Sequence, residues 1–242
     1  QGYPEATATQ YGADDLFVPR YGGIAPYYNM WDVANGAELI DTATGKVRAG
    51  VTRRYSPTDW AKAGYRDGIR NEINFKISGG NDTTKHYFSL GYLDDEGYIN
   101  NSQYNRYSTR LNISTKATKW LKANANLSYT HGVNNDATGY GGGVVTYMLD
   151  YTPTIYDIYM RDADGAVVYN ENTGDPLYDF GDNTVGNTRE FSATYNGVGE
   201  SIYNIDRTVR NTLNANLSLV ADITDGLTFE TTYGLNSVDS NF

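Results

Sequence analysis

Hydrophobic and polar residues alternate one by one along three pairs of segments, and a short turn joins the two members of each pair. In the middle pair the alternation runs over residues 110–115 and 121–130. A period of two predicts β-strands with one apolar and one polar face. Strands of about ten residues, when tilted, just cross the apolar layer of a membrane. The pattern therefore predicts a barrel wall, apolar toward lipid and polar toward a lumen.

The predicted turns lie at residues 79–82, 116–119 and 222–226, and the intervening connections, the first of them predicted from Asp94 to Gln103, are longer. Short turns at one end and long loops at the other are typical of outer-membrane barrels. We expect an all-β fold, an antiparallel transmembrane β-barrel segment with long extracellular loops. Its parts are an extracellular loop region over 1–69 with a short helical turn before Trp60, four barrel strands over 70–131, a long acidic extracellular loop over 132–206, and a barrel hairpin over 207–242.

Composition agrees with a barrel more than with membrane helices. The longest apolar stretches, such as residues 144–149, are far shorter than the roughly 20 residues that a membrane helix needs. The 242 residues include 23 Tyr, a residue that forms the interfacial girdles of transmembrane barrels but also carbohydrate-binding surfaces. The net charge of -10 argues against nucleic acid as a partner, and the absence of Cys excludes disulfides and thiolate chemistry.

Few residues offer catalytic or metal-binding chemistry. His86 and His131 are the only imidazoles and fall at strand ends, where an interfacial role is the commoner one. Asp162, Asp164 and Glu171 partly fit a calcium loop, but Met160 stands at its first ligand position, so we favour an Asp-Gly turn. No cofactor and no enzymatic activity are expected.

Two groups of polar or aromatic residues are candidates for binding. Aromatic side chains in the long loops can stack on sugar rings, although loop packing is their commoner use. These aromatic candidates are Tyr27, Tyr28, Trp31, Tyr140 and Tyr147. Four cations fall on the polar faces of the first four strands and require a wet or plugged interior. These cations are Lys76, Arg106, Arg110 and Lys122.

The segment from Ser78 to Tyr92, SGGNDTTKHYFSLGY, continues through Asp95-Glu96-Gly97. Together with Thr58-Asp59-Trp60 upstream, and with residues 107–112 and 120–122 downstream, it resembles the SusC/RagA family of TonB-dependent outer-membrane transporters. The resemblance covers roughly residues 56–238. It implies a barrel of about 22 strands closed around a plug, of which six strands are visible here. It also implies that the plug and its TonB-contacting box lie outside this chain.

The resemblance implies TonB-dependent import of oligosaccharides or peptides across the outer membrane of a Gram-negative-type cell, together with a SusD-like surface lipoprotein. A second hypothesis is a soluble β-rich adhesin or glycan-binding module, whose apolar strand faces would pack against another sheet. A third, a membrane-embedded hydrolase, would require His86 or His131 in catalysis and is the least supported.

Overall fold

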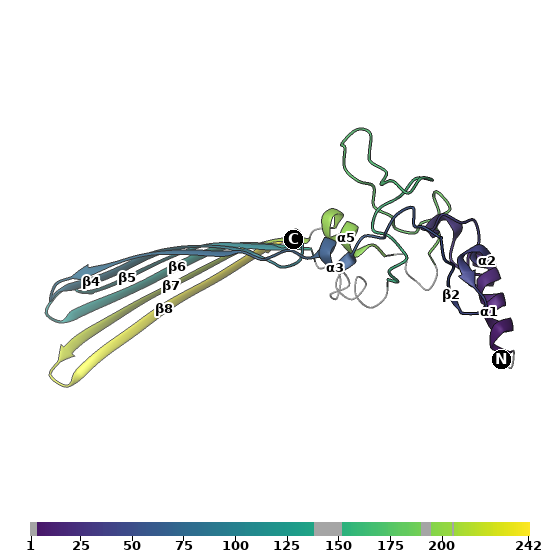
Figure 1. Ribbon diagram of the computed structural model, residues 1–242. Coiled ribbons are helices and arrows are strands. Elements are labelled where there is room, and N and C mark those ends of the chain that lie inside the picture. The colour runs from purple at the N-terminus through teal and green to yellow at the C-terminus, as the bar shows by residue number, and fades with distance from the viewer. Residues whose placement is uncertain (1–3, 138–151, 190–194, 205) are drawn as a thin grey trace. The chain divides into compact units, whose positions relative to one another are not determined.

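The computed structural model describes residues 4–137, 152–189, 195–204 and 206–242, which form parts of two compact units (Figure 1). We call Arg66–Ala137 with Ile205–Phe242 the sheet unit, and Gln1–Tyr65 with Thr138–Asn204 the loop unit. Among the described residues, no helix combines the length and the apolar character needed to cross a membrane.

The sheet unit is a six-stranded antiparallel meander in which sequential strands are always neighbours, in the order β3-β4-β5-β6-β7-β8. Figure 1 shows these strands side by side, from blue at the start of the sheet to yellow at its end. Their bounds are β3 Arg70–Gly80, β4 Thr84–Glu96, β5 Gln103–Lys116, β6 Leu121–Asp136, β7 Asp206–Thr224 and β8 Leu227–Asn241. The alternation therefore produces strands where the sequence predicts them.

The register gives the sheet one face made mainly of apolar residues and one made mainly of polar residues. One cross-strand row of the apolar face is Phe88, Leu111, Leu127, Ala215 and Leu235. The adjacent row of the polar face is Tyr87, Asn112, Asn126, Asn216 and Gly234. Since side chains alternate sides along a strand, a shift of one residue would exchange these two faces.

The strands are longer than the alternation predicts. Asp94, Asp95 and Glu96, expected in a connection, lie at the end of β4, and the connection to β5 takes only residues 97–102. Asp95 pairs with Arg70, and Asp94 accepts a hydrogen bond of 2.8 Å from the Gln103 side chain. Cross-strand polar contacts continue the ladder here, where both faces are polar and hydrophobic periodicity gives no signal.

Local side-chain hydrogen bonds form the hairpin turns. In the β3–β4 turn, Asn81 Oδ1 accepts from the backbone N–H groups of Thr83 and Thr84 at 2.9 and 2.8 Å. In the β5–β6 turn, Thr118 Oγ1 accepts from the N–H of Leu121 at 3.0 Å. Short polar side chains that bond their own backbone in this way favour turns over continued strand.

The loop unit consists of short elements joined by irregular chain. Its helices are α1 Glu5–Asp14, α2 Gly36–Leu39, α3 Trp60–Gly64 and α5 Gly197–Tyr203, with 3-10 turns η1 Pro19–Tyr21 and η2 Pro26–Tyr28 and a ribbon of β1 Ile40–Asp41 and β2 Lys46–Val47. Helix α3 begins at Trp60, directly after the predicted start of a helical turn, and Asp59 caps it by accepting from the Lys62 N–H at 3.1 Å. Helix α1 was not expected, because residues 1–69 carry no sustained hydrophobic period.

Gly226 occupies the tight β7–β8 turn with φ of 84°, in the left-handed region, and no atom lies within 4 Å of a Cβ placed there. We therefore expect Gly226→Ala to destabilise the sheet unit by about 1 kcal/mol through backbone strain alone. Guanidinium unfolding of the whole protein in lipid vesicles measures this loss. Asp225→Asn in the same turn is the control and should leave stability unchanged; equal stability of all three proteins would contradict the prediction.

Candidate functional site

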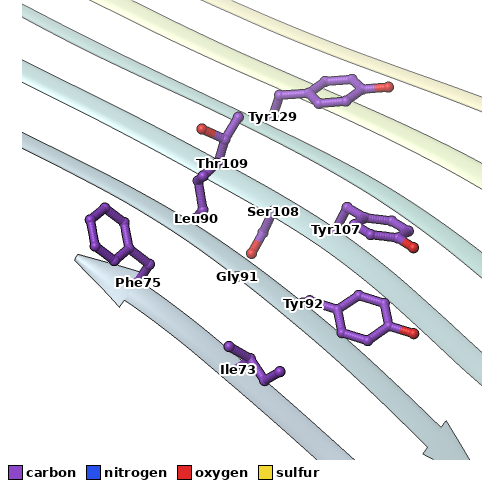
Figure 2. A pocket seen from close by; sticks show the side chains of 9 residues that line it. All are labelled: Ile73, Phe75, Leu90, Gly91, Tyr92, Tyr107, Ser108, Thr109 and Tyr129. Atoms are coloured by element: carbon purple, nitrogen blue, oxygen red, sulfur yellow. The ribbon is translucent and has the colours of Figure 1, made fainter. Parts of the chain in front are cut away.

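The apolar face of the sheet carries a groove of about 300 Å³, and Figure 2 shows the side chains of β3 to β6 that line it. The tyrosines beside it, Tyr92, Tyr107 and Tyr129, turn their hydroxyl groups to the same side in Figure 2. The rings of Tyr92 and Tyr107 lie 4.9 Å apart. Tyrosines gathered at one level of an apolar wall, with their hydroxyls on the same side, are typical of an interfacial girdle.

The two histidines lie on this apolar face but far from each other. His86 pairs with Ile113 and His131 with Tyr107, so they are separated by six residues along β5, or about 20 Å. His131 Nδ1 is 2.8 Å from Asn211 Oδ1, which also accepts a hydrogen bond from the Tyr129 hydroxyl at 2.9 Å. His131 thus belongs to the tyrosine row, and the two imidazoles do not form one site.

The register puts Lys76, Arg106, Arg110 and Lys122 on the polar face, as the sequence predicts. Arg106 lies 3.8 Å from a Glu72 oxygen, and Lys122 lies 3.5 Å from an Asp222 oxygen. Arg110 borders a hollow of about 320 Å³ lined mainly by asparagines of β5, β6 and β7. These ion pairs are more than a third exposed, so each contributes little to stability. The polar face is a hydrated surface that can face a lumen.

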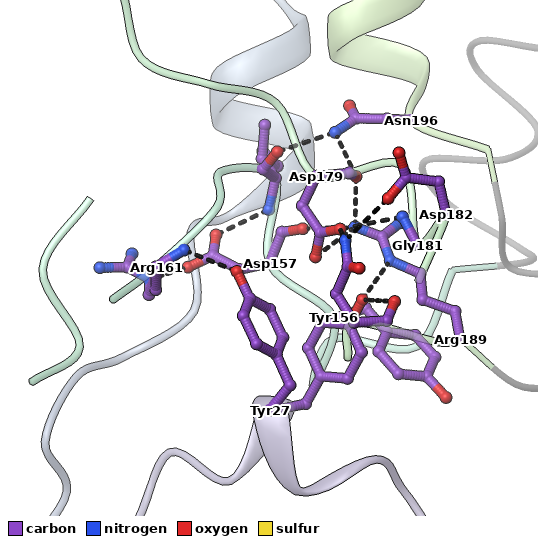
Figure 3. A network of polar contacts seen from close by, with 12 residues as sticks. Tyr27, Tyr156, Asp157, Arg161, Asp179, Gly181, Asp182, Arg189 and Asn196 are labelled. Atoms are coloured by element: carbon purple, nitrogen blue, oxygen red, sulfur yellow. Dashed lines mark hydrogen bonds and ion pairs between the residues drawn. The ribbon is translucent and has the colours of Figure 1, made fainter. Parts of the chain in front are cut away.

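In the loop unit, the side chain of Arg189 is completely buried (Figure 3). Its Nη2 donates to the carbonyl oxygens of Asp157 at 2.7 Å and Asp179 at 2.6 Å, and lies 3.3 Å from the Asp179 carboxylate. The guanidinium carbon is within 6 Å of the rings of Tyr156 and Trp60. A buried charge is tolerated only when it is paired and hydrogen-bonded, and Arg189 meets both conditions.

Two further polar residues extend this network to distant parts of the chain. Asn196 donates to the carbonyl oxygens of Ile158 at 2.8 Å and Asp179 at 2.9 Å, and its Oδ1 caps α5. Asp157 forms an ion pair with Arg161 and accepts from the Thr58 N–H at 3.0 Å. The network thus joins segments that are separated by up to about 160 residues, and it fixes the fold of the loop unit.

Tyr27 and Tyr28, two of the aromatic binding candidates, take part in this packing. Tyr28 is buried, its ring lies 4.7 Å from that of Tyr156, and its hydroxyl donates to the Asn187 carbonyl at 2.7 Å. Burial raises the pKa of Tyr28, so its hydroxyl stays protonated and can donate. The Tyr27 hydroxyl accepts from the Arg161 N–H at 2.9 Å. Both residues therefore pack within the loop unit, which is the commoner use of loop aromatics.

The other candidates have different surroundings. Trp31 is partly exposed and borders a cavity of the loop unit. Tyr140 and Tyr147 lie outside the described residues. Asp162 Oδ1 accepts from the N–H groups of Asp164 and Ala166 at 3.0 and 2.8 Å, which is an Asp-Gly turn geometry. The described residues contain no cluster of three or more His, Cys, Asp or Glu side chains able to hold a metal ion.

Arg189, Asp179 and Asn196 were not among the residues singled out from the sequence. The one available signal was that Arg189 is one of only two basic residues between Asp150 and Glu200, a stretch with ten acidic ones. An isolated cation in an acidic segment is a candidate for a buried ion pair. No periodicity marks its partners, because they come from irregular chain.

No protein-family model matches this chain. TonB-dependent receptor P3 of Formosa agariphila is 28% identical over 222 residues, which is 87% of this chain and 20% of that protein. TonB-dependent receptor SusC of Bacteroides thetaiotaomicron is 30% identical over 102 residues, 41% of this chain and 10% of that protein. The chain thus spans a fifth or less of these curated relatives.

Solved structures show the same fold. The RagAB peptide importer in its open-open state superposes with a TM-score of 0.58 at 22% identity, covering 98% of this chain and 25% of that one. Its closed-closed state gives a TM-score of 0.56. The resemblance to the SusC/RagA family is confirmed. The sheet unit accordingly has the fold of a SusC/RagA barrel wall, and the expected all-β antiparallel architecture is also confirmed.

We expect the two faces of β6 to meet different surroundings, lipid on one side and water on the other. Leu127 is on the apolar face, and Asn126 beside it is on the polar face. Leu127→Arg should destabilise the barrel by about 2–4 kcal/mol, because it places a charge in the lipid layer. Asn126→Arg, the control, should change stability by about 0.5 kcal/mol or less. Guanidinium unfolding of the whole protein in vesicles measures both, and a larger effect at Asn126 would reverse the assignment of faces.

Removal of the Arg189 charge should unfold the loop unit locally. Arg189→Met leaves the buried Asp179 carboxylate without its cation, at a cost of about 3–5 kcal/mol. Hydrogen exchange of the whole SusC/RagA-like protein should show lost protection at α5 and little change in the sheet unit. Arg20→Met, at an exposed arginine of the same unit, is the control and should leave α5 protected. Undiminished protection of α5 in Arg189→Met would contradict a supporting role for this network.

Proposed function

We propose that this chain is part of a TonB-dependent transporter that imports oligosaccharides or peptides across the outer membrane. The observation that carries the proposal is the six-stranded meander with one apolar and one polar face, whose fold matches the RagAB importer. Such a wall separates lipid from a wet lumen, and its backbone groups are paired between strands. The whole protein's cargo would cross through the lumen that the polar face lines.

The exposure of the apolar face favours this function over a soluble adhesin. Ile73 is 67% exposed and Phe75 57% exposed, and no second sheet covers them in the part of the chain that the structure describes. A soluble sandwich would bury these side chains against another layer. A contiguous apolar surface of this kind fits contact with lipid.

The loop unit would lie on the extracellular side and contact substrate and a SusD-like surface lipoprotein. The long connection between β6 and β7 supports this orientation, because outer-membrane barrels carry their long loops outside. RagAB, the structural neighbour, is a peptide importer, whereas the partly exposed Trp31 offers a ring on which a sugar can stack. The proposed cargo therefore includes both oligosaccharides and peptides.

Uptake measurements test the proposal. Cells that produce the whole protein and its lipoprotein should accumulate a fluorescently labelled mixture of oligosaccharides and peptides. Deletion of TonB should abolish this accumulation, because the plug then receives no energy from the inner membrane. Uptake of a small porin substrate is the control and should not change. Accumulation that is equal with and without TonB would refute energy-coupled import.

A further inference from the structure

The groove on the apolar face of the sheet unit has no role in the proposed transport function. Its volume of about 300 Å³ lies at the lower end of the range that is usual for small-molecule sites. A groove of this size holds a short ligand or one part of a longer one. Its lining comes from β3, β4, β5 and β6, so it belongs to the sheet unit alone.

The register explains why the apolar face is hollowed here. Leu90 and Tyr129 are the cross-strand neighbours of Thr109 on its two sides, and both have larger side chains. Phe75 follows beyond Leu90 in the same row. A short side chain in a row of large ones leaves a depression between them. Because the backbone ladder fixes the strands, this depression exists before any ligand arrives, which lowers the entropic cost of binding.

One end of the groove meets polar residues. Tyr92 and Tyr107 form the next row, and their hydroxyl groups point in the direction in which β4 ends (Figure 2). The following row on the same face, about 7 Å further along the strands, consists of Asn71, Asp94 and Asn105. The apolar groove thus leads to a polar border. A ligand with an apolar chain and a polar head matches this sequence of surfaces.

Asp94 determines which charge the head should carry. Its neighbour Asp95 lies 2.8 Å from Arg70. Asp94 accepts a hydrogen bond from Gln103 but forms no ion pair among the residues that the structure describes. Its carboxylate attracts a cation and repels a phosphate anion. A primary ammonium is a suitable cation, because its three N–H donors can reach both a carboxylate and a tyrosine hydroxyl.

We propose that the groove holds one chain of a zwitterionic lipid whose head group carries a primary ammonium, such as phosphatidylethanolamine. The chain lies beside Thr109, and the ammonium lies near Asp94, past the hydroxyls of Tyr92 and Tyr107. Lipid is the occupant because the groove is continuous with exposed apolar side chains such as Ile73. The inference rests on the proposed function only for the placement of this face in the membrane. A lipid held in this way would exchange more slowly than the surrounding lipid.

Photocrosslinking tests where the lipid lies. The whole protein is reconstituted in phosphatidylcholine vesicles with a small fraction of phosphatidylethanolamine that carries a diazirine in one chain, and mass spectrometry locates the crosslinks. They should concentrate on groove residues of β4, β5 and β6. Thr109→Phe fills the groove and should lower this yield about tenfold. Thr231→Phe, at an exposed threonine opposite Leu219 on the apolar face and outside the groove, is the matched control.

Competition with unlabelled lipid tests the head group. Phosphatidylethanolamine should displace the labelled lipid about threefold better than phosphatidylglycerol with the same chains, which corresponds to one exposed ion pair. Asp94→Asn keeps an acceptor oxygen for Gln103 but removes the charge, so it should abolish this preference and leave the crosslinked positions unchanged. Asp239→Asn, at an exposed position of β8 opposite Asn211, is the control and should keep the preference.

Three results would overturn the assignment: crosslinks spread evenly over the apolar residues of all six strands, an unchanged yield in Thr109→Phe, or equal competition by phosphatidylglycerol. The vesicles contain neither TonB nor cargo. These results are therefore distinct from failure of the proposed function, which would appear as accumulation that does not depend on TonB.

Discussion

Backbone pairing between neighbouring strands is the constraint on which the sheet unit depends. Each N–H and C=O group that enters lipid must find a partner within the protein. The six strands meet this requirement between neighbours by an antiparallel ladder in which each strand pairs with the next along the chain. Irregular chain offers no such ladder of partners. The same requirement that makes the sheet unit regular thus keeps irregular chain out of it.

The two units are stabilised by different interactions. In the sheet unit the ion pairs, such as Arg106 with Glu72, are exposed to water and contribute about 0–1 kcal/mol each. In the loop unit the pair of Arg189 with Asp179 has no exposed side-chain surface. Removing one partner of such a pair costs several kcal/mol, because the other charge stays buried. A loop region with few regular elements therefore depends on a small number of buried polar residues.

How well each part could be predicted depends on how far apart in the sequence its interacting residues lie. The hairpins were predicted because alternation is local: Leu111 and Ile113 reveal a strand without knowledge of their partners. The extra strand length at Asp94 to Glu96 was missed, since polar residues on both faces leave no period. The Arg189 network was missed because its partners are distant in sequence and irregular in spacing. The groove of the apolar face was missed too, since it depends on the cross-strand register that puts Thr109 between Leu90 and Tyr129.

Trp60 connects the buried network to the cavity. Its ring lies 5.7 Å from the Arg189 guanidinium carbon, and its indole lines the cavity. The part of the cavity lined by Trp60 is therefore in contact with the buried network that holds the loop unit together. Trp31 and Arg53, in contrast, belong to two short segments that an isolated bridge joins. Substitutions at Trp31 or Arg53 can therefore change the lining of the cavity without disturbing the buried arginine, whereas a change at Trp60 would also affect the fold of the loop unit.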